Sequence, residues 1–335
     1  MKILYAIQAT GNGHLARATK IVPVLREIAD TDVLISGIQG DIQLPFEFQY
    51  KFYGISFIFG TKGGVDLKKT ILKLRIFRFL KDVARLPVKK YDIVLCDFEP
   101  VSAWACKLKG KKSIGLGHQY AVLHPDSPPP PKIDWFGNFI LKHYAPVTKK
   151  YGFHFKQLDA FNFEPVIRPD IRNCTPENKG HYTVYLPSFS DEKIIRILSL
   201  WPEIKWEVFS KHTKSTYRVS NILIQPVSLE KFNQSFTSCE GILCTAGFET
   251  PAEAIFMGKK LCVIPMKNQY EQACNAAFLS EIGITVLTDL LDEKIKLNYW
   301  LQNDSRVQIK YQDKTHEILQ KIIMEENVSD VLFKP

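Results

Sequence analysis

The feature that most constrains the fold is an alternation of short apolar runs with amphipathic stretches, which occurs twice along the chain. Four β-prone apolar runs in the first half are separated by stretches with helical spacing, at 3–9, 33–36, 93–96 and 113–117. The second half repeats the pattern with six such runs, at 183–187, 206–210, 221–225, 241–244, 261–265 and 284–287. Short strands that are apolar throughout and alternate with helices are typical of a parallel sheet covered on both faces. The pattern therefore predicts an α/β protein built from parallel sheets.

The chain has 335 residues, which is too long for one ordinary hydrophobic core. A polar stretch with three prolines, 163–180, lies near its midpoint and has the composition of a linker. We therefore predict two facing, Rossmann-like, doubly wound domains, 1–160 and 181–335, joined by a linker at 161–180 and separated by a cleft. The last helix is a candidate to pack back on the first domain.

The composition excludes several classes of protein. The first apolar run lasts only about seven residues before a glycine-rich turn, so it is a strand and not a signal peptide. No window reaches the roughly 18 apolar residues of a membrane-spanning helix. The seven cysteines contain no CxxC pair, which favours reduced thiols in the cytoplasm and argues against a metal site.

Basic residues are concentrated in one segment. Residues 62–90 hold ten Lys and Arg side chains against two Asp, so the segment carries most of the net charge of +9. A helix is expected at Leu67–Leu86, with an apolar face formed by Leu72, Ile76, Phe79 and Val83. Arg78, Lys81 and Arg85 lie on the face of this helix opposite the apolar one, with Lys68, Lys69 and Lys73 on its flanks.

Two interpretations of this basic helix remain open. It is either the solvated face of a helix packed on the sheet, or a surface that docks the protein on anionic lipid. Nucleic acid fits less well, because Phe77 and Phe79 lie toward the apolar face and not among the charges. We expect a cytoplasmic protein, with peripheral binding at the inner face of the membrane as the second interpretation.

A glycine-rich turn, GNGHLAR at 11–17, follows the first strand and leads into a helix. In this context glycines let a ligand approach the backbone, and the helix N–H groups can bind an oxyanion. The G-x-G-x-x-A spacing also fits a NAD site. Such a site needs an acidic residue at the end of the second strand, about 20 residues after the turn. The first acidic residue after the end of that strand is Asp41, which follows a further glycine. A NAD-dependent enzyme is therefore the less favoured reading of this turn.

His14, within this turn, is the candidate general base. A histidine at a helix start, at the mouth of a parallel sheet, faces the cleft, and imidazole suits proton abstraction near neutral pH. Asp97 follows the strand at 93–96 on the same sheet edge and could orient the ring. Alternatively, Asp97 caps the following helix. His118 and Gln119, after the next strand, are further polar groups at this edge.

The second motif, TAGFETPAE at 245–253, joins the strand at 241–244 to a helix. Gly247 and Thr250 lie in its turn and first helical residues, an arrangement that suits a diphosphate. Glu253 could accept two ribose hydroxyl groups. The loop after the next strand supplies hydrogen-bonding groups suited to a sugar: Gln269, Glu271, Gln272 and Asn275. Together these features indicate a nucleotide-sugar site.

The order of these motifs resembles that of the GT-B nucleotide-sugar glycosyltransferases over the whole chain. The chain is similar to the peptidoglycan lipid-linked N-acetylglucosaminyltransferase and to the UDP-glucuronosyl and UDP-glucosyl transferases. On this resemblance the catalytic pair is His14 with Asp97. The acceptor contacts are expected from Gly11, Asn12, Gly13, Arg17, His118 and Gln119. The donor contacts are expected from Ser188, Thr245, Ala246, Gly247, Phe248, Thr250, Glu253, Pro265, Met266, Gln269, Glu271, Gln272 and Asn275.

The expected function is inverting, metal-independent transfer of a sugar from a UDP-sugar to a hydroxyl group of a glycan or lipid-linked acceptor, without a cofactor. Helix N-termini would take the place of a metal at the leaving diphosphate. Two features depart from the family: Glu271 stands where Gln or Asp is common, and the loop at 188–190 lacks the glycines of some relatives. A nucleotide-sugar epimerase and a non-catalytic nucleotide-sugar-binding protein remain open as alternatives.

Overall fold

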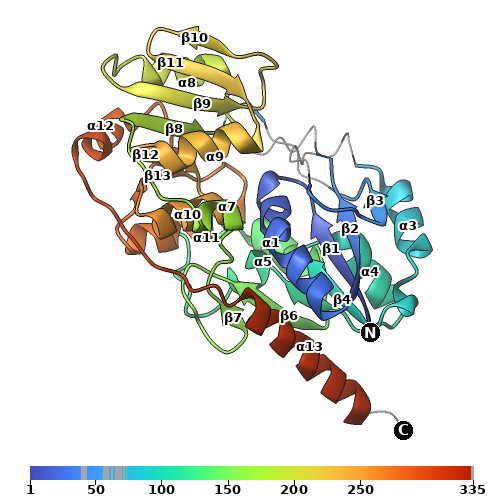
Figure 1. Ribbon diagram of the computed structural model, residues 1–335. Helices are drawn as coiled ribbons and strands as arrows, with labels where there is room; N and C mark the ends of the chain where they lie inside the picture. The colour runs from blue at the N-terminus through green and yellow to red at the C-terminus, as the bar shows by residue number, and fades with distance from the viewer. Residues whose placement is uncertain are drawn as a thin grey trace.

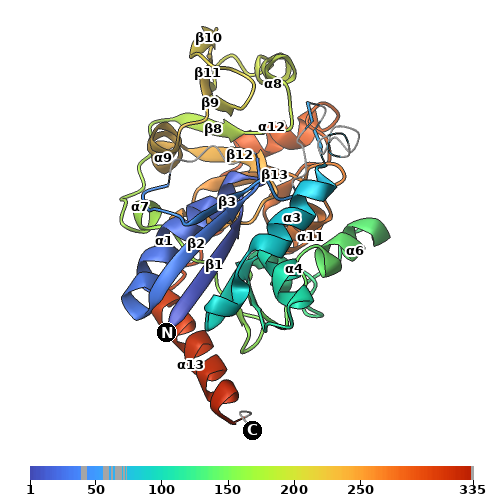
Figure 2. The same cartoon turned by 90° about the vertical axis from the view of Figure 1, so that its right-hand side faces the viewer.

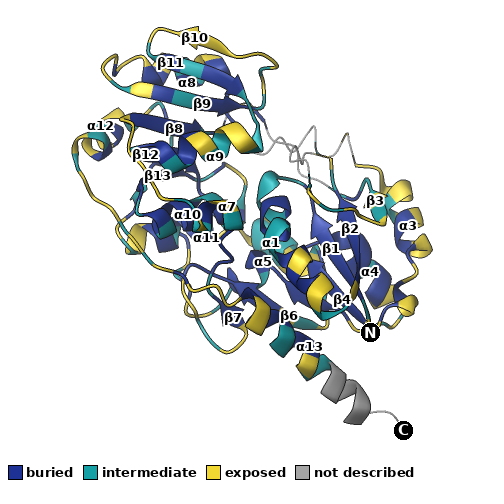
Figure 3. Ribbon diagram, viewed as in Figure 1, coloured by how far each residue is buried: buried dark blue, intermediate teal, exposed yellow. Residues whose placement is uncertain are grey.

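Two α/β domains face each other in a computed structural model that describes residues 1–38, 44–55, 60, 61, 63, 64, 70, 72 and 74–332, with side chains through 326 (Figure 1). Within these residues each domain holds one seven-stranded sheet. The strands of both sheets are largely buried (Figure 3), because helices cover them. The prediction of two Rossmann-like, parallel-sheet domains is confirmed.

The first sheet has the strand order β3-β2-β1-β4-β5-β6-β7, and every neighbouring pair is parallel. From β3 to β6 this is the order of a doubly wound sheet, in which the crevice at the carboxyl ends of β1 and β4 binds ligands. In Figure 2, α1 lies on one side of this sheet and α3 and α4 on the other. The strands are β1 (Lys2–Gln8), β2 (Asp30–Ser36), β3 (Tyr50–Phe52), β4 (Ile93–Asp97), β5 (Ile114–Leu116), β6 (Lys149–Phe153) and β7 (Asn162–Phe163).

The second sheet repeats this plan, in the order β10-β11-β9-β8-β12-β13-β14. Only β10 pairs antiparallel with its neighbour among the described strands, at the sheet edge. The strands are β8 (His181–Tyr185), β9 (Lys205–Ser210), β10 (Tyr217–Val219), β11 (Ile222–Pro226), β12 (Gly241–Thr245), β13 (Lys260–Ile264) and β14 (Thr285–Val286).

Helices connect the strands in both domains. Those of the first half are α1 (Asn12–Ile28), α3 (Ile76–Arg85), the 3-10 helix η1 (Val88–Lys90), α4 (Pro100–Leu108), α5 (His118–Ala121), α6 (Trp135–His143) and α7 (Pro169–Arg172). Those of the second half are α8 (Asp191–Leu198), α9 (Leu229–Ser238), α10 (Glu249–Met257), α11 (Tyr270–Glu281), α12 (Lys294–Gln302) and α13 (Thr315–Leu332).

The basic helix differs most from its prediction. Leu74 and Arg75 are not helical, so the helix expected at Leu67–Leu86 is interrupted and α3 begins only at Ile76. A helix at a sheet edge buries only the turns that pack against the rest of the domain. In α3 these are the later turns, where Asp82 and Val83 are buried, and α3 also contacts α4. Of the basic side chains, Lys68, Lys69 and Lys73 lie outside the described residues.

The apolar face predicted for this helix is wrong at its first two positions. Leu72 is 83% exposed and Ile76 is 54% exposed, whereas Phe79 is half-buried and Val83 is buried. The segment therefore presents apolar as well as basic groups to solvent.

The chain passes between the domains twice. The segment predicted as a linker contributes β7 to the edge of the first sheet before the chain enters the second domain. After the second domain, α13 returns and packs on α1 (Figure 1). The Lys20 ammonium lies 2.7 Å from Asp313, and the Tyr311 hydroxyl donates to the Phe155 carbonyl at 3.0 Å.

Candidate functional site

The glycine-rich turn places the start of α1 at the interface of the two domains. Gly11 is the N-cap of α1, and no side chain caps the free N–H groups of the first turn. Gly13 faces α10 of the second domain, where a Cβ atom at position 13 would lie 3.2 Å from Glu249 Cγ. The turn therefore lets the two domains approach closely beside exposed helix N–H groups, as an anion-binding site requires.

His14 and Asp97 form the predicted pair. His14 Nδ1 lies 2.8 Å from Asp97 Oδ1, and the Tyr5 hydroxyl donates to Asp97 Oδ2 at 3.1 Å. The close packing depends on Gly117, because a Cβ atom there would lie 2.7 Å from Asp97 Oδ1. The alternative role of Asp97 as a helix cap is wrong, since the Glu99 side chain accepts the free N–H groups at the start of α4.

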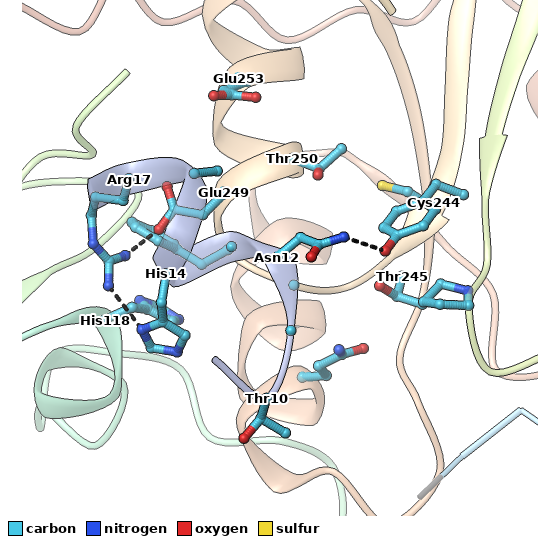
Figure 4. A pocket seen from close by; sticks show the side chains of 18 of the residues that line it. Thr10, Asn12, His14, Arg17, His118, Cys244, Thr245, Glu249, Thr250 and Glu253 are labelled. Atoms are coloured by element: carbon cyan, nitrogen blue, oxygen red, sulfur yellow. Dashed lines mark hydrogen bonds and ion pairs between the residues drawn. The ribbon is translucent and has the colours of Figure 1, made fainter. Parts of the chain in front are cut away.

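Arg17 lies one helical turn after His14 and is 1% exposed. Its Nη2 donates to Asp97 Oδ1 at 2.6 Å. Its Nη1 donates to Glu249 of the second domain, as Figure 4 shows. Burial acts to raise the pKa of Asp97, but Arg17 and His14 hold it below its ordinary value. Burial raises the pKa of Glu249 to about 7. Asp97 is thus a buried anion balanced by a fixed cation.

The other nitrogen of the His14 ring faces the cleft. Gln119 Nε2 lies 3.3 Å from His14 Nε2 and donates to Glu271 Oε2 at 3.0 Å. An amide N–H that points at Nε2 suits a ring whose proton is on Nδ1, toward Asp97. Nε2 is then the unprotonated ring nitrogen, and it lies beside Gln119, which lines both cavities with His14. Burial raises the pKa of Glu271 above its ordinary value.

His118, the second histidine of this edge, is held as a structural group. Its ring stacks on Phe248 of the second domain at 3.9 Å between centroids. Nδ1 lies 2.8 Å from the Phe153 carbonyl, and Nε2 lies 2.7 Å from Asn275 Oδ1. Burial lowers the pKa of His118 to about 4. Because both nitrogens are engaged, His118 does not offer a free base beside His14.

The start of α10 forms the opposite wall of the site. Gly247, Phe248 and Thr250 line the cavity there, and Glu253 follows one turn later (Figure 4). The two Glu253 oxygens accept hydrogen bonds from Arg168 Nε and Nη2 at 2.7 and 2.8 Å. Arg168 comes from the segment between the domains and is 4% exposed, and its Nη1 has no partner among the described residues.

Two adjoining cavities meet at the candidate base. The larger, of about 240 Å³, lies between the start of α1 and the start of α10. The smaller, of about 100 Å³, opens between Phe98 and α6. The residues that line both cavities are Thr10, His14, Gln119, Gln269 and Glu271. A donor in the larger cavity and an acceptor in the smaller one would therefore meet at His14.

The larger cavity collects most of the predicted binding residues. They are Gly11, Asn12, Gly13, His14, Arg17, His118, Gln119, Thr245, Gly247, Phe248, Thr250, Glu253, Met266, Gln269, Glu271 and Gln272. Asp97 lies behind His14 and completes the pair without lining the cavity.

Four predicted donor contacts do not line either cavity: Ser188, Ala246, Pro265 and Asn275. Asn275 is used within the protein, since its Nδ2 donates to the Ala246 carbonyl at 3.1 Å and its Oδ1 faces His118. The Ser188 carbonyl accepts the Gly63 N–H of the first domain at 2.7 Å. Asn275 thus links the second domain to His118, and the Ser188 backbone links it to Gly63, while the donor contacts predicted for both residues remain predictions.

Sequence reasoning missed three parts of the site. Arg168 lies in a proline-rich segment that was predicted only to be a linker, and no role was predicted for Glu249. The wall formed by Tyr185, Val227, Leu229 and Phe232 carries no motif. No local sequence signal marks Arg168, because its burial and its partner Glu253 are set by the fold.

Comparison with protein families agrees with this geometry. Residues 1–303 match the model of glycosyl transferase family 1, which covers most of the chain. The chain belongs to glycosyl transferase family 1. No curated protein matches it significantly. Glycosyl transferase family 1 membership makes the chain a transferase of sugars, as the two motifs indicated.

Solved structures show that this member of glycosyl transferase family 1 has the GT-B fold. A UDP-glucosyltransferase from Polygonum tinctorium is 12% identical, with a TM-score of 0.56 over 99% of this chain and 94% of that one. Spinosyn forosaminyltransferase SpnP is 12% identical, with a TM-score of 0.54 over 98% and 95%. MurG of Acinetobacter baumannii is 15% identical, with a TM-score of 0.53 over 97% and 99%. These identities establish the fold alone.

The residues that the structure describes contain no group of three or more His, Cys, Asp or Glu side chains arranged to hold a metal ion. None of their helices combines the length and the apolar character needed to cross a bilayer.

Proposed function

We propose that the protein transfers a sugar from a UDP-sugar to a hydroxyl group of a glycan or lipid-linked acceptor, with inversion at the anomeric carbon. The observation that carries this proposal is the position of His14 at the junction of the two cavities, with Asp97 behind it. His14 Nε2 takes the proton of the acceptor hydroxyl. The acceptor oxygen bonds to the anomeric carbon while the bond to the diphosphate breaks, and UDP leaves with the electron pair.

The start of α10 supports a diphosphate in the larger cavity. Thr250 and Gly247 line the cavity there, and no side-chain hydrogen bond caps the helix. Free N–H groups and the partial positive charge of a helix N-terminus stabilise an anionic leaving group. The proposed reaction therefore uses protein N–H groups at the diphosphate and needs no metal.

The pair of Glu253 and Arg168 supports the ribose. Each Glu253 oxygen accepts one hydrogen bond from Arg168, and a carboxylate oxygen has two acceptor sites. One site per oxygen therefore remains for a ribose hydroxyl. Gln269, Glu271 and Gln272 line the end of the cavity near His14, where the transferred sugar would lie.

The proposal is tested by incubating the protein with radiolabelled nucleotide sugars and a panel of glycan and lipid-linked acceptors. We expect release of UDP together with a new glycoside of inverted anomeric configuration, and equal turnover in EDTA. Epimerised donor without an acceptor would support the epimerase. Tight UDP-sugar binding with no turnover on any acceptor would support the non-catalytic binding protein. Turnover that stops in EDTA would contradict the metal-independent mechanism.

We propose in addition that the segment around α3 docks on an anionic membrane surface. Arg78, Lys81 and Arg85 are exposed on α3. Beside them Phe77 is 90% exposed and Leu80 is 51% exposed. Exposed basic residues attract anionic headgroups, and neighbouring aromatic and aliphatic side chains favour the interface. Such docking would bring the acceptor domain to a lipid-linked substrate.

Vesicle flotation measures this docking. The wild-type protein should float with phosphatidylglycerol vesicles and not with phosphatidylcholine vesicles. Reversing Arg78, Lys81 and Arg85 to Glu should lower the partition coefficient by about 100-fold or more, since each basic residue near an anionic surface adds about 1 kcal/mol.

A matched control reverses three exposed basic residues of the second domain, Lys214, Lys294 and Lys296. This variant changes the net charge by the same amount and should float as the wild type does. Equal recovery of the wild type, the α3 variant and the control variant with both kinds of vesicle would show that the α3 segment is an ordinary solvated surface.

A further inference from the structure

Arg17 is a buried cation that the proposed reaction does not use. Its guanidinium carbon lies 5.4 Å from the ring centroid of Phe153, and its Nε has no partner among the described residues. Its strong polar contacts go to two carboxylates, Asp97 of the first domain and Glu249 of the second. A buried charge of this kind is costly unless it is paired, so its placement requires an explanation.

The first contact concerns the candidate base directly. Arg17 Nη2 and His14 Nδ1 converge on the same oxygen, Asp97 Oδ1, at 2.6 and 2.8 Å. These two nitrogens lie 3.3 Å apart. Arg17 and His14 therefore share one carboxylate oxygen, so the position of the guanidinium decides whether His14 Nδ1 keeps its contact with Asp97.

The second contact joins this pair to the other domain. Glu249 is the first residue of α10, beside the groups proposed to bind the diphosphate. It engages Arg17 Nη1, so that only Nη2 is available to Asp97. Without Glu249, both ends of the guanidinium could turn to Asp97 in the bidentate arrangement that arginine favours. His14 would then lose its place on Oδ1.

Charged and titratable groups approach His14 from five elements. They are Arg17 on α1, Asp97 on β4, His118 on α5, Glu249 on α10 and Glu271 on α11. Arg17 is the one permanent cation of this set, and it alone contacts carboxylates of both domains.

We propose that Arg17 is a positioning residue that couples the donor-binding domain to the catalytic base: Glu249 holds one end of the guanidinium, which leaves Asp97 Oδ1 able to orient the His14 ring through Nδ1. The inference rests on the proposed role of His14 in sugar transfer. The base is assembled only when α10 is in place against α1.

Nitrogen-15 spectra of the histidine rings test the inference on the free protein above neutral pH. The His14 signals are assigned by their absence in His14→Ala. In the wild type we expect a neutral ring with Nδ1 protonated. In Arg17→Met the unbalanced Asp97 should hold His14 as the doubly protonated imidazolium. In Glu249→Leu the signals of the Nε2–H form should appear, because Arg17 displaces His14 from Asp97.

Two variants serve as controls. Glu249→Gln keeps an oxygen that can accept from Arg17 Nη1, so it should retain the wild-type ring spectrum. Arg26→Met removes a positive charge from the exposed side of the same helix, and it should also leave the His14 signals unchanged. If Arg17→Met does not fold, the contrast between Glu249→Leu and Glu249→Gln still decides the question.

Kinetics provide the second measurement. Glu249→Leu should lower kcat by about 10- to 100-fold, as expected for a misplaced catalytic group, while its affinity for UDP does not fall. Wild-type ring spectra in Arg17→Met or Glu249→Leu would overturn the inference even if the enzyme transfers sugar and depends on His14. Absence of transfer by the wild type would refute the proposed function, and the ring spectra would still report the coupling.

Discussion

Replacement of His14 by alanine should lower kcat by about 10²- to 10⁴-fold, which is the usual contribution of a general base. The side chain lines both cavities, and the ring contacts the interior of the protein mainly through Asp97 and Arg17. Its loss therefore removes the proton acceptor with little effect on the donor cavity around α10. Initial rates at saturating donor and acceptor measure the change, and calorimetric titration with UDP should show unchanged affinity.

A histidine on the surface of the second domain provides the control for this experiment. His212 is exposed and distant from both cavities, so His212→Ala should turn over at the wild-type rate. If His14→Ala keeps the wild-type kcat, the assignment of the base fails. Asp97→Asn would then show whether the carboxylate itself takes the proton, because that variant keeps the shape of the pair and removes its charge.

Removal of Arg168 should destabilise the protein by about 3–5 kcal/mol, the cost of leaving a buried charge without its partner. Glu253 is 1% exposed and Arg168 is 4% exposed, so Arg168→Met leaves the Glu253 carboxylate buried without its partner. The free energy of unfolding in urea measures the loss. Affinity for UDP should fall as well, because the pair lies at the end of the larger cavity.

The double variant Arg168→Met/Glu253→Leu separates this cause from simple loss of packing. With both charges removed, most of the lost stability should return, since paired buried charges and apolar replacements are often nearly equivalent. Lys179→Met, which removes an exposed ion pair, should leave the unfolding midpoint unchanged. A double variant as unstable as Arg168→Met would contradict the electrostatic explanation.

Local sequence patterns were sufficient to predict the parts of the site that lie within a single turn of the chain. The turn at 11–17 and the start of α10 follow from glycines, helix signals and a preceding strand, and all of these are neighbours in the chain. His14 and Asp97 could be paired because the carboxyl ends of parallel strands share one edge. The structure places both where this argument required.

Contacts between segments that are far apart in the sequence could not be predicted from local patterns. The Arg168 pair with Glu253 joins residues 85 positions apart, and Arg17 meets Glu249 across 232 positions. A sequence shows that these side chains are charged, but it does not show which charges are buried together. For the same reason Asn275 was assigned to a sugar, although it supports His118.

The prediction for α3 failed for a different reason. The apolar residues from Leu72 to Val83 have helical spacing, which indicates a helix but not how much of it lies on the sheet. Only the later turns do so, and Ile76 remains exposed. Periodicity describes a face, whereas burial depends on what the fold places opposite that face.

The return of α13 to α1 has a consequence for the order in which the protein is made. Because α13 packs on α1 and its Glu325 bonds Lys149 and Tyr151 of β6, the first domain is completed by residues that follow the entire second domain. During synthesis the second domain can complete its own sheet first, while the surface of α1 that receives α13 remains uncovered. The domain that is synthesised first is therefore the domain whose packing is completed last.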